Sequence, residues 1–499
     1  MDDPILHAPA ASPTDAAPPA AKARPPAHRQ GLGWWMRQAR ALAARCRTAM
    51  DEDPVHDLRT SLRRCRTMAS GIRRFDPDPA WEKMNRAARR LFRALGTLRD
   101  VQVMAEWVRT LSPPGDAAGA VMLDRLAGRE AEEKARAAIA LSAFDPEGWK
   151  AWSRTLPGRA RRVPRKALAF SQLAIEAWEH VRALKEKALE TRTAGDLHRL
   201  RIAVKRFRYV AENFLPEVYK GCGDTLKRVQ DLLGDIHDLD VLRQALLESG
   251  VLSTRAAQAR WLSVIGRVSR ERLREVVRLD AGRESVWSRW RALLPSGRRE
   301  REATLARFEA WTAFRDPDLP HARQVRKLSM ALFGALGRAG LPGPYRDERA
   351  RRILEAAALM HDAGRSAGVE GHHKAVYERI REIAPPAGWL PEDVVMTALV
   401  ARYHRGALPR EEHAGFAELP LPDRDTVICL SGILRLADAF DGHHDGSVRG
   451  VQVEAFPQAV LVRAAGYEEA GTLSSIVAAK KSLLESVYNR PVIVSRMDR

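Results

Sequence analysis

The sequence has 499 residues and a formal net charge of +20, with 45% hydrophobic and 29% charged residues. At about 100–200 residues per domain, this length predicts two to four domains, and the composition excludes a largely disordered chain. The charge is uneven, because residues 1–300 carry +19 and residues 301–499 carry +1. The first part therefore favours a polyanionic partner, whereas the second has the balance of an ordinary globular domain.

Cysteine usage and apolar runs remove further classes of protein. The four cysteines, Cys46, Cys65, Cys222 and Cys429, include no Cys-x-x-Cys pair, which excludes a cysteine zinc ribbon and indicates no disulfide framework. No apolar run approaches the ~18–20 residues of a membrane helix, and no basic segment followed by an apolar one opens the sequence. We therefore expect a cytoplasmic protein without a membrane partner.

The amino-acid composition of successive segments of the chain predicts a mainly α protein. Residues 1–29 form a Pro/Ala-rich tail that we expect to be disordered. From residue 31 to residue 294, Leu, Ala, Arg and Glu dominate, and this composition predicts helices. Turn-forming residues predict breaks at 113–115, at Pro157-Gly158 and Pro164, and at 295–297.

A second helical region begins near residue 301 and changes character in its last 50 residues. Alternating apolar residues predict short strands within 448–462 and at 492–494, with a helix over 473–488 between them. The predicted fold class is therefore a helical domain followed by a second helical domain that ends in a small α+β tail.

The first region contains an internal repeat. Residues 56–66 (HDLRTSLRRCR) align without gaps with residues 198–208 (HRLRIAVKRFR), and residues 95–103 (LGTLRDVQV) align with residues 233–241 (LGDIHDLDV). The period is too long for a solenoid. It predicts a duplicated helical-bundle domain over 30–298, with repeats at about 30–150 and 167–298 related by a pseudo-twofold axis.

Each repeat places its basic residues on one helix face. At 100° per residue, His56, Arg59, Arg63 and Arg66 fall within an arc of roughly 80°. The second repeat does the same with His198, Arg201, Lys205 and Arg208. Aligned cations repel one another unless an anion lies along them. Two such basic ridges, brought together by pseudo-symmetry, would line a channel suited to a chain of phosphates.

Other interpretations of these residues remain open at this point. A basic stripe is also typical of a solvated helix face, and His56 and His198 could be cap or core histidines. Asp100 and Asp238, in the second repeated motif, are expected to hold arginines or cap helices. Anionic lipid and nucleic acid are alternative polyanions, but aromatic residues make up only 6% of the sequence and no stacking platform is visible, which disfavours nucleic acid.

The two repeated motifs resemble the CHAD domain, the "conserved histidine α-helical domain". This resemblance implies an all-helical, pseudo-symmetric module that binds inorganic polyphosphate. Carried over position by position, it implies phosphate contacts at His56, Arg59, Arg63, Arg66, His198, Arg201, Lys205 and Arg208, with Arg64 and Arg206 as secondary candidates.

The second region carries a set of histidines and aspartates typical of a metal site. His321 opens one predicted helix, His361-Asp362 follows the apolar segment 353–360, and Asp438 lies in another apolar segment. Imidazole and carboxylate are ligands of Zn, Mn, Fe or Mg. A buried lone carboxylate is costly, so Asp438 needs a partner, which a metal or Arg435 would supply.

This order of residues resembles the HD superfamily of metal-dependent phosphohydrolases. The segments EAAALMHDAG (355–364), GHHK (371–374), ARYHR (401–405) and ILRLADAFD (433–441) are similar to the C-terminal domain of the exopolyphosphatase and guanosine pentaphosphate phosphohydrolase family. The resemblance covers residues 305–499, which we identify as an HD-type domain. It implies one or two divalent ions (Mn, Mg, Fe or Zn) and the metal ligands His321, His361, Asp362, His372, His373, His404 and Asp438.

The implied chemistry is hydrolysis of a phosphoanhydride. Asp362 would bridge metal and water, and Lys374, Arg402 and Arg405 would hold phosphates, so these four are the candidate catalytic residues. The predicted function is a polyphosphate-binding protein with a metal-dependent phosphohydrolase domain, associated with polyphosphate granules. Two alternatives stay open: a non-catalytic binding or regulatory protein, and a hydrolase of guanosine polyphosphates or other nucleotides.

Overall fold

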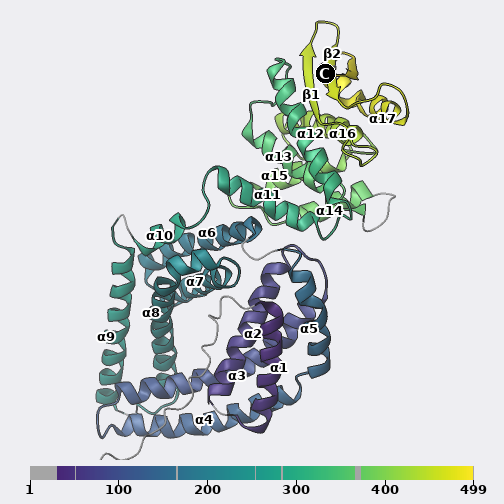
Figure 1. Cartoon of the computed structure of the whole chain (residues 1–499). Helices are drawn as coiled ribbons and strands as arrows, with labels where there is room; N and C mark the ends of the chain where they lie inside the picture. Colours follow the sequence, from purple (N-terminus) through teal and green to yellow (C-terminus); the bar gives the residue numbers. More distant parts are fainter. Residues whose placement is uncertain are drawn as a thin grey trace, which may run out of the picture.

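A computed structural model describes residues 31–50, 52–163, 167–252, 254–282, 285–365 and 372–497. The protein is mainly α-helical, with one small three-stranded sheet near its C-terminal end (Figure 1), which confirms the predicted fold class. The predicted tail at 1–29 lies outside the described residues. Among the described helices, none is both long enough and apolar enough to cross a lipid bilayer.

The first domain consists of two sets of helices in the same order. The first set is α1 (Leu32–Thr48), α2 (Glu52–Ile72), α3 (Ala80–Leu111), α4 (Ala117–Ser142) and α5 (Pro146–Ala160). The second set is α6 (Leu168–Thr191), α7 (Ala194–Phe214), α8 (Pro216–Glu248), α9 (Arg255–Asp280) and α10 (Val286–Ala292). Helices α2 and α7 have 21 residues each, α3 and α8 have 32 and 33, and α4 and α9 have 26 each. The two sets thus match in order, and their three middle helices match in length, whereas α1 and α5 differ in length from α6 and α10.

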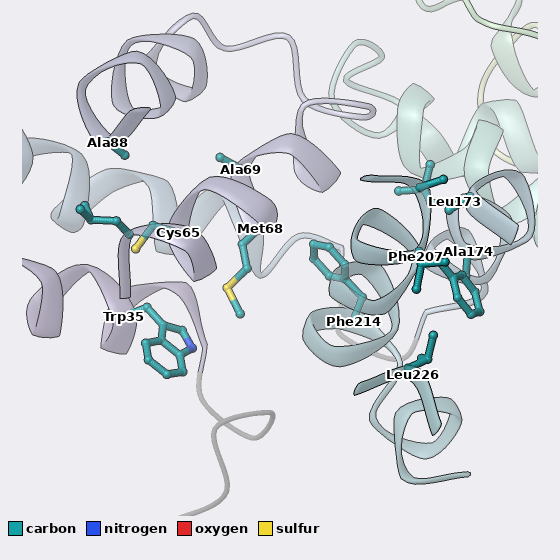
Figure 2. Packing of buried hydrophobic residues seen from close by; sticks show 14 of the residues in the cluster. Trp35, Cys65, Met68, Ala69, Ala88, Leu173, Ala174, Phe207, Phe214 and Leu226 are labelled. Atoms are coloured by element: carbon teal, nitrogen blue, oxygen red, sulfur yellow. The ribbon is translucent and has the colours of Figure 1, made fainter. Parts of the chain in front are cut away.

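Equivalent helices of the two sets pack against each other. Helix α2 contacts α7, and α3 contacts α8, as a pseudo-twofold arrangement requires. One hydrophobic cluster runs through both sets, and Figure 2 shows Phe214 of α7 between the labelled residues of the two halves. A Cβ atom on Gly71 of α2 would lie 2.5 Å from the Phe214 ring, so glycine permits this close approach.

The second domain has a helical core and a sheet at its far end (Figure 1). Its helices are α11 (Arg298–Thr312), α12 (Leu319–Arg338), α13 (Glu348–Met360), α14 (His372–Arg381), α15 (Pro391–Arg402), α16 (Leu421–Phe440), α17 (Thr472–Lys480) and α18 (Ser482–Tyr488). Strand β1 (Gly450–Ala455) pairs antiparallel with β2 (Val460–Ala465), which pairs parallel with β3 (Val492–Arg496).

Helix α11 joins the two domains. Its Phe308 and Trp311 belong to the core of the second domain, while Ala306 and Ala310 pack against the core of the first. Helix α11 lies against α6, and Arg307 forms an ion pair with Glu176 of α6. The junction is therefore a packed interface with its own buried ion pair.

Two local predictions were wrong. Pro157 does not end α5, which continues to Ala160, because the buried side chains of Trp149 and Leu156 hold its last turns in the core. The predicted helix over 473–488 is two helices, which meet at Lys481.

Candidate functional sites

The basic ridges lie on α2 and α7, the two helices that meet at the centre of the first domain. Leu58, Leu62 and Cys65 are fully buried, which places the opposite face of α2 toward the partner helix. A cavity of about 530 Å³ lies between the helices, with Arg63 of α2 and Lys205 of α7 in its wall. The Arg63 guanidinium lies 5.1 Å from the Tyr209 ring of α7. The two ridges therefore line one space.

Several ridge arginines have a buried guanidinium nitrogen that makes no hydrogen bond with the described residues. One guanidinium nitrogen is buried and without a hydrogen-bond partner among the described residues in each of Arg59, Arg63, Arg201 and Arg208. A buried donor left unpaired costs about 1–3 kcal/mol. Four such groups in one channel indicate that the folded protein is arranged for an anion.

The glycine of the repeated Leu-Gly motif lies beside a ridge arginine in each half, a contact that sequence reasoning missed. A Cβ atom on Gly96 would lie 3.2 Å from Arg59 Nη1, and one on Gly234 would lie 3.9 Å from Arg201 Nε. The motif had been found by its repetition, but its glycine had been given no role. At α3 a Cβ atom would crowd the guanidinium, so the small size of Gly96 favours this contact, whereas at α8 a Cβ atom would make only an ordinary contact.

Burial and neighbouring charges shift the pKa values of side chains in this channel. Burial, together with the charges of Arg201, Arg63 and Arg59, lowers the pKa of Lys205 to about 8. Burial also raises the pKa of Asp238 to about 6, although the charge of Arg201 acts in the opposite direction. The channel thus holds cations that repel one another and a carboxyl group that resists ionisation.

The remaining predicted contacts differ in their surroundings. His56 and Arg206 are exposed, whereas His198 is half-buried, with its Nδ1 3.2 Å from His237 Nδ1. Arg64 is buried and bonded to Glu212 and Asn213. Its guanidinium is already paired inside the fold, so we leave Arg64 out of the proposed phosphate contacts.

The second site is a cluster of histidines and aspartates drawn from four segments. His321 lies in the first turn of α12, and His361 and Asp362 follow the end of α13. His404 follows α15, and Asp438 lies in α16. The ligand atoms form two groups, His321–His361–Asp438 and His361–Asp362–His404, and within each group they lie within 4.8 Å of one another. His361 is shared by both groups.

The histidine rings are turned so that Nε2 faces the cluster. His361 Nδ1 lies 2.9 Å from the carbonyl oxygen of Ala358, and His404 Nδ1 lies 2.6 Å from that of Ala401. His361 Nε2 is buried without a hydrogen-bond partner among the described residues, with carboxylate oxygens of Asp362 and Asp438 3.7 and 3.6 Å away. An unpaired imidazole nitrogen between two carboxylates fits a divalent metal ion.

The pKa values of several residues in the cluster are strongly shifted. Burial would lower the pKa of His321, but its hydrogen bonds with Asp438 and Asp441 raise that pKa to about 10. Burial and the neighbouring His361 lower the pKa of His404 to about 3. Despite burial, the neighbouring imidazoles of His321 and His361 hold the pKa of Asp438 well below its usual range. The carboxylate of Asp438 therefore stays ionised.

Two residues that support the cluster had not been assigned a role. Asp441, at the C-terminal end of α16, lies with its Oδ2 2.7 Å from His321 Nδ1 and orients that ring. Lys480 donates to Asp438 Oδ2 at 3.3 Å. Arg435, one of the two expected partners of Asp438, instead donates to the carbonyl oxygens of Tyr403 and Gly406. Of Asp441 and Lys480, only Asp441 could have been found from the sequence, because it lies three residues after Asp438.

The other predicted residues lie outside the two three-residue groups. Lys374 of α14 and Arg405 are exposed, and the Arg402 guanidinium lies 5.2 Å from the Tyr377 ring. His373 is half-buried, and a Cβ atom on Gly406 would lie 3.1 Å from its Nε2. Among the described residues, neither three-residue group includes His373. The side chain of His372 lies outside the described residues.

Comparison with known proteins agrees with both motif resemblances. Residues 34–247 match the family described as CHAD domain, and residues 301–459 match the family described as Ppx/GppA phosphatase, domain III. The search of curated proteins found no match to the chain. The two matched segments contain the basic ridges and the five residues of the His–Asp cluster, respectively.

Proposed function

Because the chain joins a CHAD domain to a Ppx/GppA phosphatase domain III, we propose that it binds inorganic polyphosphate between its basic ridges and hydrolyses phosphoanhydride bonds at its His–Asp cluster. The observation that carries this proposal is the set of buried, unpartnered guanidinium nitrogens in the channel between α2 and α7. A channel of unpaired cations needs an anion with many charges, and polyphosphate repeats one negative charge at every phosphate.

The proposed binding residues are those of the two ridges. Guanidinium groups bind phosphate through two parallel hydrogen bonds, and a bound phosphate also removes the repulsion between neighbouring cations. The proposed contacts are His56, Arg59, Arg63, Arg66, His198, Arg201, Lys205, Arg206 and Arg208.

The proposed hydrolytic site is the His–Asp cluster, which we assign to the HD type. His321, His361, Asp362 and Asp438 would hold a divalent ion, with His404 completing a site for a second. Such an ion, when bound, supplies a water of lowered pKa and polarises a phosphoryl oxygen.

Residues next to the cluster would hold its carboxylates in place, and other residues would bind the substrate. Lys480 and Arg365 hold the carboxylates of Asp438 and Asp362 by hydrogen bonds of 3.3 and 2.9 Å. We propose that Lys374, Arg402 and Arg405 bind the phosphates of the chain end.

Phosphate release tests this proposal. The full chain is incubated with Mn²⁺ or Mg²⁺ and long-chain polyphosphate, beside Asp362→Ala and the control Asp425→Ala, which removes an exposed carboxylate of α16. We expect release from the wild type and the control and none from Asp362→Ala. Tight binding without phosphate release would indicate a non-catalytic polyphosphate-binding protein. Phosphate release from a guanosine polyphosphate alone would indicate that the nucleotide, and not polyphosphate, is the substrate.

A further inference from the structure

A second basic cavity lies where the two domains meet. Its volume is about 370 Å³, and its wall contains aromatic residues of α11 and an excess of cations. The charged residues in the wall are Arg73, Arg74, Arg307, Arg315, Arg379 and Glu382. Five arginines against one carboxylate leave a strong positive potential in a concave space.

This junction cavity adjoins the ridge cavity. Arg74, which follows the end of α2, lies in the wall of both cavities. Glu176 lines the ridge cavity, and its ion-pair partner Arg307 lines the junction cavity, so this pair stands between the two spaces. A bound anion could therefore continue from one cavity to the other past a shared arginine.

The opposite wall of the junction cavity is attached to the His–Asp cluster. Arg379 of α14 donates from Nη1 to the carbonyl oxygen of Ala363 at 2.6 Å. Ala363 directly follows Asp362, which belongs to the cluster. The cavity thus lies beside the loop that carries a proposed metal ligand.

Two arginines of the junction also donate hydrogen bonds to neutral backbone groups. Arg315 donates to the carbonyl oxygens of Phe75 and Trp311, and Arg307 donates to that of Ala384 at 2.9 Å. A carbonyl oxygen fixes a guanidinium without cancelling its charge. These bonds fix the guanidinium groups of Arg315 and Arg307 in the cavity wall. Glu176 offsets the charge of Arg307, and Glu82 lies 3.5 Å from Arg73, so a smaller net positive charge remains in the wall.

We infer that the junction cavity is a phosphate-binding site that holds the segment of a polyphosphate chain between the ridges and the His–Asp cluster. This inference rests on the proposed function, since it takes polyphosphate as the ligand. It assigns a phosphate contact to Arg379, a residue of the second domain that lies outside the ridges and the cluster.

Polyphosphate binding to the metal-free full chain tests this inference without requiring hydrolysis. Affinity and its salt dependence are measured in EDTA for the wild type, Arg379→Gln and Arg381→Gln. The last is the matched control, because Arg381 is an exposed arginine of the same helix and is not in the cavity wall. Arg73→Gln, which changes an exposed residue of the cavity wall, is a second variant in case Arg379→Gln does not fold.

We expect Arg379→Gln or Arg73→Gln to weaken binding about five- to tenfold and to lower the slope of log affinity against log salt by about one, as for the loss of one phosphate contact. Arg381→Gln should bind like the wild type. Unchanged binding by Arg379→Gln and Arg73→Gln, or an equal loss in Arg381→Gln, would overturn the inference. Arg63→Gln separates the two proposals: if it also binds like the wild type, polyphosphate binding at the ridges fails as well.

Discussion

The ridges of the first domain and the cluster of the second are both partly or fully buried, but they differ in the groups they bring together. Between the ridges, guanidinium nitrogens lack partners and the pKa of Lys205 falls to about 8. In the cluster, Asp438 keeps its pKa well below the usual range and the pKa of His321 rises to about 10. The groups brought together indicate the ligand: guanidinium nitrogens without a hydrogen-bond partner favour an anion at the ridges, and an unpartnered imidazole nitrogen beside two carboxylates favours a metal cation at the cluster.

The largest expected effect comes from the residue that both metal groups share. His361→Ala removes a ligand from each group, so we expect phosphate release to fall by about 10³-fold or more, with loss of bound metal. Metal content and phosphate release in Mn²⁺ are the measurements. His443→Ala, an exposed histidine outside the cluster, is the control. Normal metal content in His361→Ala would show that the cluster is not the metal site.

Two neighbouring arginines of α2, Arg63 and Arg64, allow a paired and an unpaired cation to be compared. Arg64→Met strands the buried Glu212, so the free energy of unfolding should fall by about 3–5 kcal/mol. Arg63→Met removes an unpaired cation from a repulsive channel, so stability should be unchanged or higher while polyphosphate binding weakens. Urea unfolding of both variants decides this, and equal destabilisation would contradict the distinction.

A smaller effect is expected from the residue that orients His321. Asp441→Asn replaces the carboxylate that accepts from His321 Nδ1, so metal affinity should fall about 10–100-fold without loss of fold. Competition with a chromophoric chelator measures the affinity. Asp445→Asn, which changes an exposed carboxylate nearby, serves as the reference. The role given to Asp441 is wrong if both variants bind metal alike.

The smallest effect is a pH dependence of polyphosphate binding. Lys205 faces Arg59 and Arg63 of α2, Arg201 of its own helix and Asp100 of α3, and its pKa is about 8. A bound phosphate raises this pKa, so binding takes up a proton and affinity should fall as pH rises through about 8, by at most about tenfold per pH unit.

Binding isotherms between pH 7 and 9.5 at constant ionic strength measure this dependence. Lys205→Arg keeps its charge throughout the range and should flatten the curve. A wild-type affinity that stays constant from pH 7 to 9.5 would remove Lys205 from the phosphate contacts.

The two sites also differ in how far the sequence predicts them. Each ridge lies on one helix, so a 3.6-residue period was enough to place Arg59 and Arg63 on one face. The cluster gathers distant segments, so no helical period could place His321, His361 and Asp438 together. Their residue types and apolar surroundings, together with a motif resemblance, predicted that they share a metal site.

The contacts that the sequence did not predict depend on packing between distant segments. Lys480 reaches Asp438 only because α17 packs against α16. Arg64 pairs with Glu212 because α2 meets α7, and the junction cavity exists only once the domains have docked. No local pattern carries such contacts between segments that are far apart in the chain.

The central claim is that the ridges hold the substrate that the cluster hydrolyses, and substrate length tests it most directly. Phosphate release is measured for the wild type and Arg201→Gln with long-chain polyphosphate and with tripolyphosphate, which is too short to lie along a ridge. We predict that Arg201→Gln raises KM for long chains about tenfold, leaves kcat unchanged and leaves tripolyphosphate hydrolysis unaltered. Equal changes with both substrates, or no change with either, would contradict the claim.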